Sequence, residues 1–568
     1  MTAQIVRNRD VAALRTAAGW PGADRATVIT LALRLASVRA DDEGYEVFQQ
    51  QSDAHPDDAL PLALAGFFQA RVGDDIEAAV AKLDKAVAAE PGVPHYFRGI
   101  ALAMLPPDMD RARTAVDDLR LVLALRDRFP SAMMRAVHRC LAIANTTLGN
   151  DDLAAESAEN AGLRGLPADS QLLFGSYWAT AEDGFRFGSP MVIEPAPGVH
   201  VLQGYDFCDF AIIETRDGIV AIDAGSTPDR VRVALDELGL SGDVSHLILT
   251  HSHFDHVGGV SALIGPRTRV ITHTAFPAEQ ARQRSSALPF SYFFGRGGGL
   301  DHHVVPDRLV SEPESLTVGG VEIVLYPTSG GETDDALMVH LPASGLLFTG
   351  DVMMPYLGAP FFAEGSPEGL LDVCRQIREL GPSMLIHGHT PLTENFTMAA
   401  IPGLEAALTE LHGHVLDDIQ RGRTLAEILE RNDLPESLRA HPKAVTPYVI
   451  VRENFASRMH HQRTGYWQQD GQGLEPLSRN EHAAALDLLA GGRADAFVAA
   501  ATTLLDQGDH ALALALVEPG LLRYPSNTAL ADLRRAALLR ALEEHQQLNP
   551  FKFLIYAELA GVEIGPAK

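Results

Sequence analysis

The chain has 568 residues, 46% of them hydrophobic and 21% charged, a composition typical of a globular protein with about two to four domains. Its formal net charge of −28 argues against nucleic-acid binding, because phosphates attract basic surfaces, and against charge-driven binding to an anionic membrane. The three cysteines lie far apart and predict buried thiols rather than disulfides. We identify no secretory signal and no apolar run of about 20 residues, and therefore expect a cytoplasmic protein without a membrane partner.

The N-terminal third is expected to be helical throughout. Segment 74–92 (DDIEAAVAKLDKAVAAEPG) places Ala79, Leu83 and Ala86 on one helix face, which is the spacing of the second helix in a tetratricopeptide-type unit. A similar pattern returns near the C-terminus in segment 508–527. We interpret both segments as parts of stacked-helix packing modules rather than as peptide-binding grooves.

Between the helical regions, the pattern changes to short β-rich runs, which predict an α/β domain. Several of these runs end in a polar or acidic residue, as in scaffolds that present active-site groups on loops. Helical stretches are expected at 228–239 and 367–380. The predicted strands are 200–204, 210–215, 218–225, 246–250, 269–273, 321–327, 336–342, 345–351 and 383–389.

Four metal-ligating side chains are concentrated in THSHFDHVGG, residues 250–259, directly after a predicted strand. In extended backbone, alternate side chains point the same way, so His251 and His253 converge on one point. Asp255 and His256 follow in the turn and can face a second point. Imidazole and carboxylate ligands suit Zn²⁺, and also Fe or Mn. Two points predict two metal ions, which together can activate one water molecule.

Two metal ions need more than four ligands, and later strand ends supply candidates. Glu332 follows one predicted strand, Asp351 ends another, and either His387 or His389 follows the last. A single acidic residue after a strand is more often a turn or cap residue than a ligand. The order of these residues and their placement at strand ends make the set a strong prediction of a metal site.

The segments THSHFDH, GDV and GHTP resemble motifs of the metallo-β-lactamase superfamily, whose fold is an αββα sandwich with a dinuclear metal site. The resemblance implies that Asp351 bridges the two metals and that His389, rather than His387, completes the second one. It also implies that Asp255 and Asp351 are catalytic. The predicted ligands are His251, His253 and Glu332 for one ion and Asp255, His256 and His389 for the other, with Asp351 shared.

A carboxylate in the third motif resembles the alkylsulfatase branch of this superfamily. The chain has Ser-Gly-Gly-Glu-Thr at 329–333, where an imidazole is usual. ALPFSYFFG (287–295) is similar to a tyrosine-containing segment of that branch, which makes Tyr292 a candidate substrate-binding residue. Segments 455–477 and 488–514 resemble the helical dimerisation domain of alkylsulfatases and imply a homodimer.

The segment after Asp351 departs from the alkylsulfatase pattern. There, alkylsulfatases carry a histidine-containing stretch that supplies a catalytic histidine and sulfate-holding groups. This chain has Asp-Val-Met-Met-Pro-Tyr-Leu-Gly at 351–358, without histidine or arginine. We expect an intact metal site beside an apolar pocket, with Tyr356 as a second candidate substrate-binding residue.

The predicted organisation is a helical repeat-like domain (1–180), a metallo-β-lactamase-type catalytic domain (181–398) and an alkylsulfatase-like helical dimerisation domain (399–568). The predicted function is a zinc-dependent hydrolase of a small molecule that uses a metal-bridging hydroxide and resembles alkylsulfatases. One alternative is hydrolysis of a carboxylic ester, lactone or amide at the same dinuclear site. Another is a helical-repeat interaction protein with a metal-binding domain.

Overall fold

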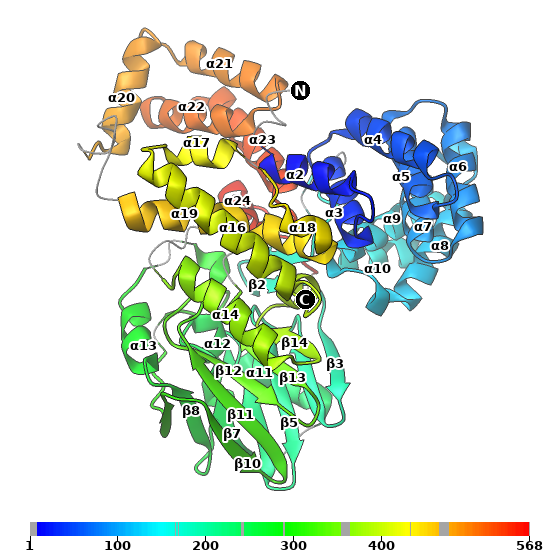
Figure 1. Ribbon diagram of the computed structural model, residues 1–568. Helices are drawn as coiled ribbons and strands as arrows, with labels where there is room; N and C mark the ends of the chain where they lie inside the picture. Colours follow the sequence, from blue (N-terminus) through cyan, green and yellow to red (C-terminus); the bar gives the residue numbers. More distant parts are fainter. Residues whose placement is uncertain are drawn as a thin grey trace.

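The computed structural model describes residues 8–164, 166–167, 170–239, 243–287, 290–300, 302–353, 364–431, 433–464 and 476–566. Figure 1 shows three regions: N-terminal helices in blue and cyan, a β-rich body in green, and C-terminal helices in yellow to red. The three cysteines, Cys140, Cys208 and Cys374, are buried and unpaired, as predicted.

The N-terminal region consists of packed helices. Helix α6 buries Ala79, Leu83 and Ala86, so the face predicted from the sequence is the core face. Gly66 of α5 allows α6 to pack closely, since a Cβ there would lie 2.9 Å from the Ala79 carbonyl oxygen. The likeness to tetratricopeptide repeats stays a prediction. The helices are α2 (Arg9–Ala18), α3 (Arg25–Ser37), α4 (Asp41–Ala54), α5 (Ala59–Val72), α6 (Ile76–Ala89), α7 (Val93–Ala103), α8 (Ala112–Ala124), α9 (Met134–Thr147) and α10 (Asp151–Ala161).

A small hairpin connects this region to the β-rich body. Strands β1 (Tyr177–Thr180) and β2 (Gly184–Phe187) pair antiparallel, and Ala179 forms a bridge with Ile564 near the other end of the chain. The sequence did not predict this hairpin, and the domain boundary predicted between residues 180 and 181 falls inside it.

The β-rich body contains two sheets packed face to face, with helices on both outer faces. The first sheet has the order β3-β4-β5-β6-β7-β8-β9 and the second has β10-β11-β12-β13-β14. The strands are β3 (Met191–Ala196), β4 (Val199–Gln203), β5 (Phe210–Thr215), β6 (Gly218–Ile222), β7 (Val244–Ile248), β8 (Arg269–His273), β9 (Arg308–Val310), β10 (Glu314–Val318), β11 (Val321–Thr328), β12 (Ala336–Leu341), β13 (Leu346–Gly350) and β14 (Met384–His387).

Apolar side chains from both sheets form the core between them, including Val220 and Ile222 of the first sheet and Leu337 and Phe348 of the second. The helices of the body are α11 (Pro228–Leu238), α12 (Phe254–Val257), α13 (Phe276–Arg284), α14 (Pro367–Leu380) and α15 (Thr390–Asn395). Helix α11 buries Val231 against the outer face of the first sheet. The predicted αββα sandwich is therefore confirmed.

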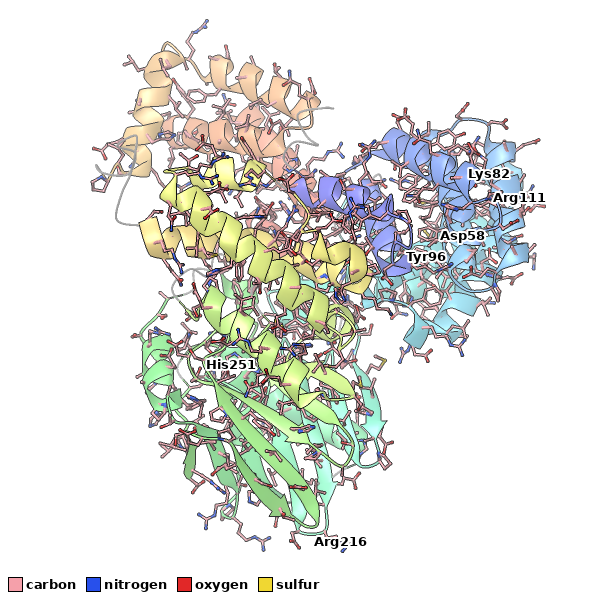
Figure 2. The ribbon with its side chains drawn as sticks, viewed as in Figure 1. Asp58, Lys82, Tyr96, Arg111, Arg216 and His251 are labelled. Carbon is pink, nitrogen blue, oxygen red and sulfur yellow. The ribbon has the colours of Figure 1, made fainter. Side chains whose placement is uncertain are left out.

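Parallel strand pairs bring the functional loops to one end of the sandwich. Strands β6, β7 and β8 run parallel, as do β13 and β14. The carboxyl ends of parallel strands meet at one edge of a sheet, where loops are free to carry polar groups. His251 lies at the end of the sandwich that faces the helical regions, and Arg216 marks the opposite end (Figure 2).

The C-terminal region is helical and packs against both other regions. Helix α19 contacts α2, α3 and α14, and Arg39 near the end of α3 pairs with Glu543 of α23. Among the described helices, none alone is long and apolar enough to cross a membrane; α20 and α21 reach that length together but are bent by 93°. The helices are α16 (Ile401–Gln420), α17 (Leu425–Glu430), α18 (Ser437–Ala440), α19 (Val445–Thr464), α20 (Arg479–Leu489), α21 (Ala494–Asp506), α22 (His510–Arg523), α23 (Thr528–Glu544) and α24 (Pro550–Ala560).

Candidate metal centre

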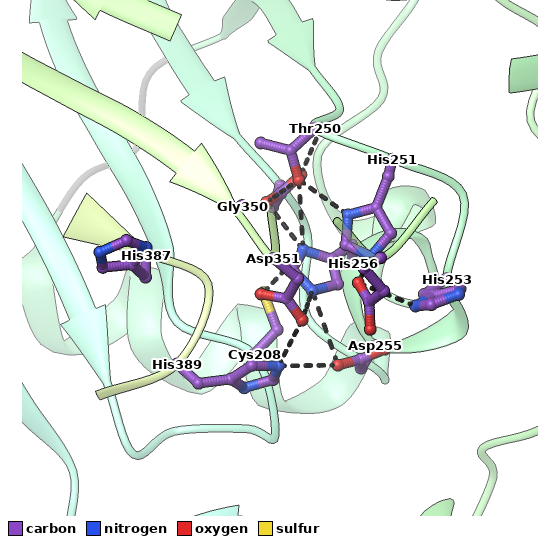
Figure 3. A network of polar contacts seen from close by, with 12 residues as sticks. Cys208, Thr250, His251, His253, Asp255, His256, Gly350, Asp351, His387 and His389 are labelled. Carbon is purple, nitrogen blue, oxygen red and sulfur yellow. Dashed lines mark hydrogen bonds and ion pairs between the residues drawn. The ribbon is translucent and has the colours of Figure 1, made fainter. Parts of the chain in front are cut away.

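Seven residues predicted as ligands form two adjacent groups at the end of the sandwich. In each group, one ligand atom per residue lies within 4.8 Å of the others. The first group, called the first pocket, consists of His251, His253 and Glu332. The second, called the second pocket, consists of Asp255, His256, Asp351 and His389. Figure 3 shows most of these side chains converging from separate loops.

The first pocket joins the loop after β7 to the loop between β11 and β12. Glu332 Oε2 lies 3.4 Å from His251 Nε2 and 3.6 Å from His253 Nδ1. His251 and Glu332 are almost fully buried, and the side chain of His253 is 12% exposed. Two imidazole nitrogens and one carboxylate oxygen at this spacing suit Zn²⁺.

The second pocket combines the short helix α12 with the ends of β13 and β14. Asp351 Oδ2 lies 2.8 Å from His389 Nε2 and 3.4 Å from His256 Nε2. Asp255 Oδ2 lies 3.5 Å from His389 Nε2 and 3.6 Å from His256 Nε2. All four residues are buried, so their polar atoms face one another instead of bulk water.

Four buried polar atoms in these pockets make no hydrogen bond within the described part of the chain: His251 Nε2, His256 Nε2, Glu332 Oε2 and Asp351 Oδ1. A buried polar atom without a partner costs about 1–3 kcal/mol, so a fold rarely tolerates several at one place. Divalent cations bound among these atoms would satisfy them. The residues present therefore fit a metal centre.

In each imidazole of the two pockets, the ring nitrogen on the far side from the pocket already has a partner. These hydrogen bonds hold the rings in orientation and select the tautomer whose other nitrogen is free to bind a cation. The pairs are His251 Nδ1 with Thr250 Oγ1 at 3.1 Å, His253 Nε2 with Glu364 Oε2 at 3.2 Å, His256 Nδ1 with Asp223 Oδ2 at 2.8 Å, and His389 Nδ1 with the Phe207 carbonyl oxygen at 2.9 Å.

The pockets carry a surplus of negative charge. Burial by itself lowers the pKa of an imidazole. At His253, the carboxylates of Glu332 and Glu364 outweigh burial and raise the pKa to about 10. At His389, the carboxylate of Asp351 outweighs burial and raises the pKa to about 9. At His251, burial and the neighbouring imidazoles instead lower the pKa well below its usual value. The carboxylates that raise the pKa of His253 and His389 would also favour a bound cation.

His387 lies outside both groups, as Figure 3 shows. Its Nδ1 lies 2.7 Å from Thr349 Oγ1 and its Nε2 lies 2.9 Å from the Phe396 carbonyl oxygen. Burial lowers its pKa to about 4, which keeps the ring neutral. Both ring nitrogens are engaged, and His387 is a core histidine.

Gly388, between these two histidines, is required by close packing. A Cβ at this position would lie 2.3 Å from Asp351 Oδ1 and 2.6 Å from His256 Cε1. Any side chain would therefore displace two residues of the second pocket.

Three residues around the pockets were missed by sequence reasoning. Asp223 follows strand β6 and contacts His256; an acidic residue directly after an apolar run was the signal that could have identified it. Cys208 Sγ lies 3.4 Å from His256 Nδ1, and burial raises the pKa of this thiol well above its usual value. Glu364 contacts His253 from a segment with no distinguishing pattern.

Two tyrosines, Tyr292 and Tyr356, were predicted to bind substrate. The backbone N–H of Tyr292 donates to Glu558 Oε2 of helix α24 at 2.9 Å, and the tyrosine is 8% exposed. Tyr356 lies outside the described residues, as do the other residues of 354–363. Their roles stay predictions.

Comparison with known proteins identifies two family regions. Residues 204–389 match the model of the Metallo-beta-lactamase superfamily, and residues 424–560 match that of Alkyl sulfatase dimerisation. The resemblance inferred from the sequence motifs is thereby confirmed.

Similar individual proteins fall into two groups. The chain is 26% identical over 190 residues to a hydroxyacylglutathione hydrolase of Rhodobacter capsulatus, covering 33% of this chain and 64% of that protein. It is 24% identical over 400 residues to an (R)-specific secondary-alkylsulfatase of Pseudomonas sp, covering 61% and 59%. The solved structure of a stereoselective inverting sec-alkylsulfatase from Pseudomonas sp. aligns with a TM-score of 0.52 at 20% identity, over 65% of each chain. The matches span about three fifths of the length of these curated relatives.

Proposed function

We propose that this chain, which carries a metallo-beta-lactamase superfamily domain followed by an alkyl sulfatase dimerisation domain, is a dinuclear metallohydrolase of ester substrates. The observation that carries the proposal is the pair of adjacent pockets in which four buried nitrogen and oxygen atoms have no hydrogen-bond partner among the described residues. A purely structural metal ion usually occupies a single site in which protein side chains supply all the ligands. Two adjacent metal sites are instead typical of hydrolytic centres.

In this proposal, the first pocket holds one Zn²⁺ through His251, His253 and Glu332. The second holds another through Asp255, His256 and His389, and Asp351 is shared. The position of Asp351 supports sharing, because its Oδ2 contacts the imidazoles of the second pocket while its charge also acts on His251 and Glu332 in the first. Fe or Mn would also suit these ligands.

When bound, the two metal ions would supply Lewis acidity and lower the pKa of a bound water molecule. The protein contributes orientation and exclusion of bulk water. Asp255 and Asp351 are buried with carboxylate oxygens directed into the second pocket, where they can accept hydrogen bonds from the attacking water and hold it in place. Asp223 and Glu364 keep the ligand imidazoles from rotating.

Alkyl sulfate esters are the first substrate class to test. The support for this choice is the combination of a metallo-beta-lactamase domain with an alkyl sulfatase dimerisation domain in one chain. A second class is carboxylic esters and acyl thioesters of the hydroxyacylglutathione type. It is favoured by the segment 351–358, which contains no histidine or arginine to bind a sulfate group.

The test is metal analysis of the purified protein, followed by a panel of alkyl sulfates, acyl thioesters, carboxylic esters and lactones. We expect two metal ions per chain and hydrolysis of at least one of these substrate classes. This hydrolysis should stop when the metal is removed with a chelator and return when Zn²⁺ is added. His389→Ala should lose one of the two ions and the activity. A protein with two bound ions but no hydrolysis of any ester class would refute the enzymatic proposal.

We further propose a homodimer formed by the C-terminal helices. The match of residues 424–560 to the dimerisation family supports it. Apolar side chains on α20 and just before it are also exposed in the single chain, including Leu488 at 82%, Leu489 at 85% and Leu477 at 68%. Such large exposed apolar residues are typical of surfaces that become buried on association.

A further inference from the structure

Helix α19 of the C-terminal region carries a buried arginine, Arg458, next to the first pocket. Arg458 is only 1% exposed, and it is among the largest fully buried side chains in the described part of the chain. Its guanidinium leaves the helical region and enters the loops of the sandwich. Arg458 lies in the segment 455–477, which resembles the dimerisation domain of alkylsulfatases, but that resemblance assigned it no role.

The two terminal nitrogens of Arg458 donate to two backbone carbonyls of the sandwich. Nη1 donates to the carbonyl of Gly331, which precedes the pocket residue Glu332. Nη2 donates to the carbonyl of Glu364. The side chain of Glu364 in turn contacts His253 Nε2 at 3.2 Å and accepts from Gln283 Nε2 at 2.7 Å. One segment held by Arg458 therefore leads directly to the pocket residue Glu332, and the other carries Glu364, which contacts the pocket residue His253.

These two segments also pack directly on each other. A Cβ on Gly365, which has φ of +54°, would lie 2.6 Å from the carbonyl oxygen of Glu332. Gln462, one turn further along α19, donates to the Gly365 carbonyl at 3.4 Å. A shift of either segment would therefore move the other, and α19 contacts both.

A buried arginine is a costly way to join two regions of a protein. The free energy of burying a guanidinium is offset only by good hydrogen bonds and nearby negative charge. Arg458 Nε has no hydrogen-bond partner among the described residues, and the bonds that Nη1 and Nη2 donate to Gly331 and Glu364 go to backbone carbonyls rather than to a carboxylate. Arg463 on the same helix joins the same regions more simply, through a partly exposed ion pair with Glu368 of α14.

We propose that Arg458 is a positioning residue for the first pocket: its guanidinium fork holds the Gly331–Glu332 and Glu364–Gly365 segments at the separation that lets Glu332 and His253 bind the same metal ion. This inference rests on the proposed metal pockets and adds that the helical C-terminal region helps to build one of them. It follows that metal affinity of the first pocket depends on the docking of α19.

The experiment measures Zn²⁺ affinity by competition with a chromogenic chelator in the full-length protein, for wild type, Arg458→Met, Arg458→Lys and the control Arg463→Met. Loss of a residue that supports a ligand typically weakens metal binding about 10–100-fold. We expect Arg458→Met to show that loss for one of the two ions and Arg463→Met to bind both as wild type does. Arg458→Lys should also weaken one ion, because a single ammonium cannot reproduce the fork.

Double variants assign the loss to a pocket. Combined with Glu332→Ala, which already disables the first pocket, Arg458→Met should cause little further loss of Zn²⁺ affinity. Combined with His389→Ala, which disables the second pocket, Arg458→Met should cause its full loss of Zn²⁺ affinity. The reason is that the effects of two substitutions add when the residues are independent and do not add when the residues interact. Circular dichroism of each metal-free variant checks folding, and if Arg458→Met does not fold, the lysine variant decides.

Wild-type affinity for both ions in the folded arginine variants would overturn the inference. An equal loss in Arg463→Met would also overturn it, because the effect would then belong to the interface in general. If the wild-type protein itself does not bind two Zn²⁺ ions, the proposed metal centre fails, and this inference fails with it.

Discussion

Asp223 offers the sharpest test of the second pocket, because one carboxylate serves three donors. Its Oδ1 accepts from the Thr250 backbone N–H at 2.8 Å, and its Oδ2 accepts from Thr250 Oγ1 at 2.8 Å and contacts His256 Nδ1 at 2.8 Å. Its φ is 60°, a conformation that asparagine adopts with little strain. Asp223→Asn therefore changes the hydrogen bonding with little change in shape.

The amide of Asn at position 223 has only one oxygen, and either orientation has a cost. If the oxygen faces Thr250 N–H, the NH₂ group faces His256 Nδ1, which must then accept; the proton moves to Nε2 and blocks the nitrogen that faces the pocket. If the oxygen faces His256, the buried Thr250 N–H loses its acceptor, at a cost of about 1–3 kcal/mol. We expect Zn²⁺ affinity of the second pocket to fall about 10–100-fold, equivalent to about 1.4–2.7 kcal/mol.

The assay is a Zn²⁺ competition titration, with Asp118→Asn as the matched control. Asp118 of helix α8 is about as buried as Asp223, and it accepts from Arg98 Nε at 2.7 Å and from Arg98 Nη2 at 2.8 Å, within the N-terminal helices. Asp118→Asn should lower the melting temperature and leave Zn²⁺ affinity unchanged. If Asp223→Asn bound both ions as tightly as wild type, orientation of His256 by Asp223 would be the wrong explanation.

His387→Gln should keep both metal ions because both nitrogens of His387 are bonded within the core, whereas His389→Gln should lose one; metal analysis that found a loss in His387→Gln would contradict the assignment. Glu332→His should still bind two ions, since imidazole is an equally good ligand, but should shift the pH–rate profile of hydrolysis to lower pH, because one negative charge fewer lowers the pKa of bound water. An unchanged profile would mean that Glu332 serves geometry alone. Light scattering should give a particle of twice the 61.1 kDa chain mass, and a monomer at micromolar concentration would count against the dimer.

Each of the nine predicted strand runs coincides with a strand of the sandwich, and both predicted helices of that domain, 228–239 and 367–380, are present. The sandwich strands that the sequence did not reveal are β3, β9 and β10, which all lie at the edges of their sheets. The physical reason is burial. Strands β3, β9 and β10 are mostly half-buried or exposed and need no continuous apolar run, whereas most of the predicted strands, including the edge strand β14, are mostly buried.

The sequence by itself determined that His251, His253, Asp255 and His256 lie close together, because local geometry decides where neighbouring side chains can point; that they bind metal stays a prediction. It also indicated Glu332, Asp351 and His389, because strand ends are the usual places for such groups; their role as ligands stays a prediction. Only the tertiary structure placed His387 in the core, two residues before His389. The packing of strand β14 against its neighbours decides whether His387 or His389 faces the pockets. Because those neighbours are distant in the sequence, they leave no signal in the local pattern.

The partners of the ligands were likewise decided by tertiary structure. Asp223 lies 33 residues from His256, Glu364 lies 111 residues from His253, and Arg458 lies 127 residues from Gly331. Such contacts depend on how sheets, loops and helix α19 pack, and each residue type is ordinary in its own segment. A sequence pattern can therefore indicate which atoms would bind a cation, whereas the packing of distant segments determines what holds those atoms in place.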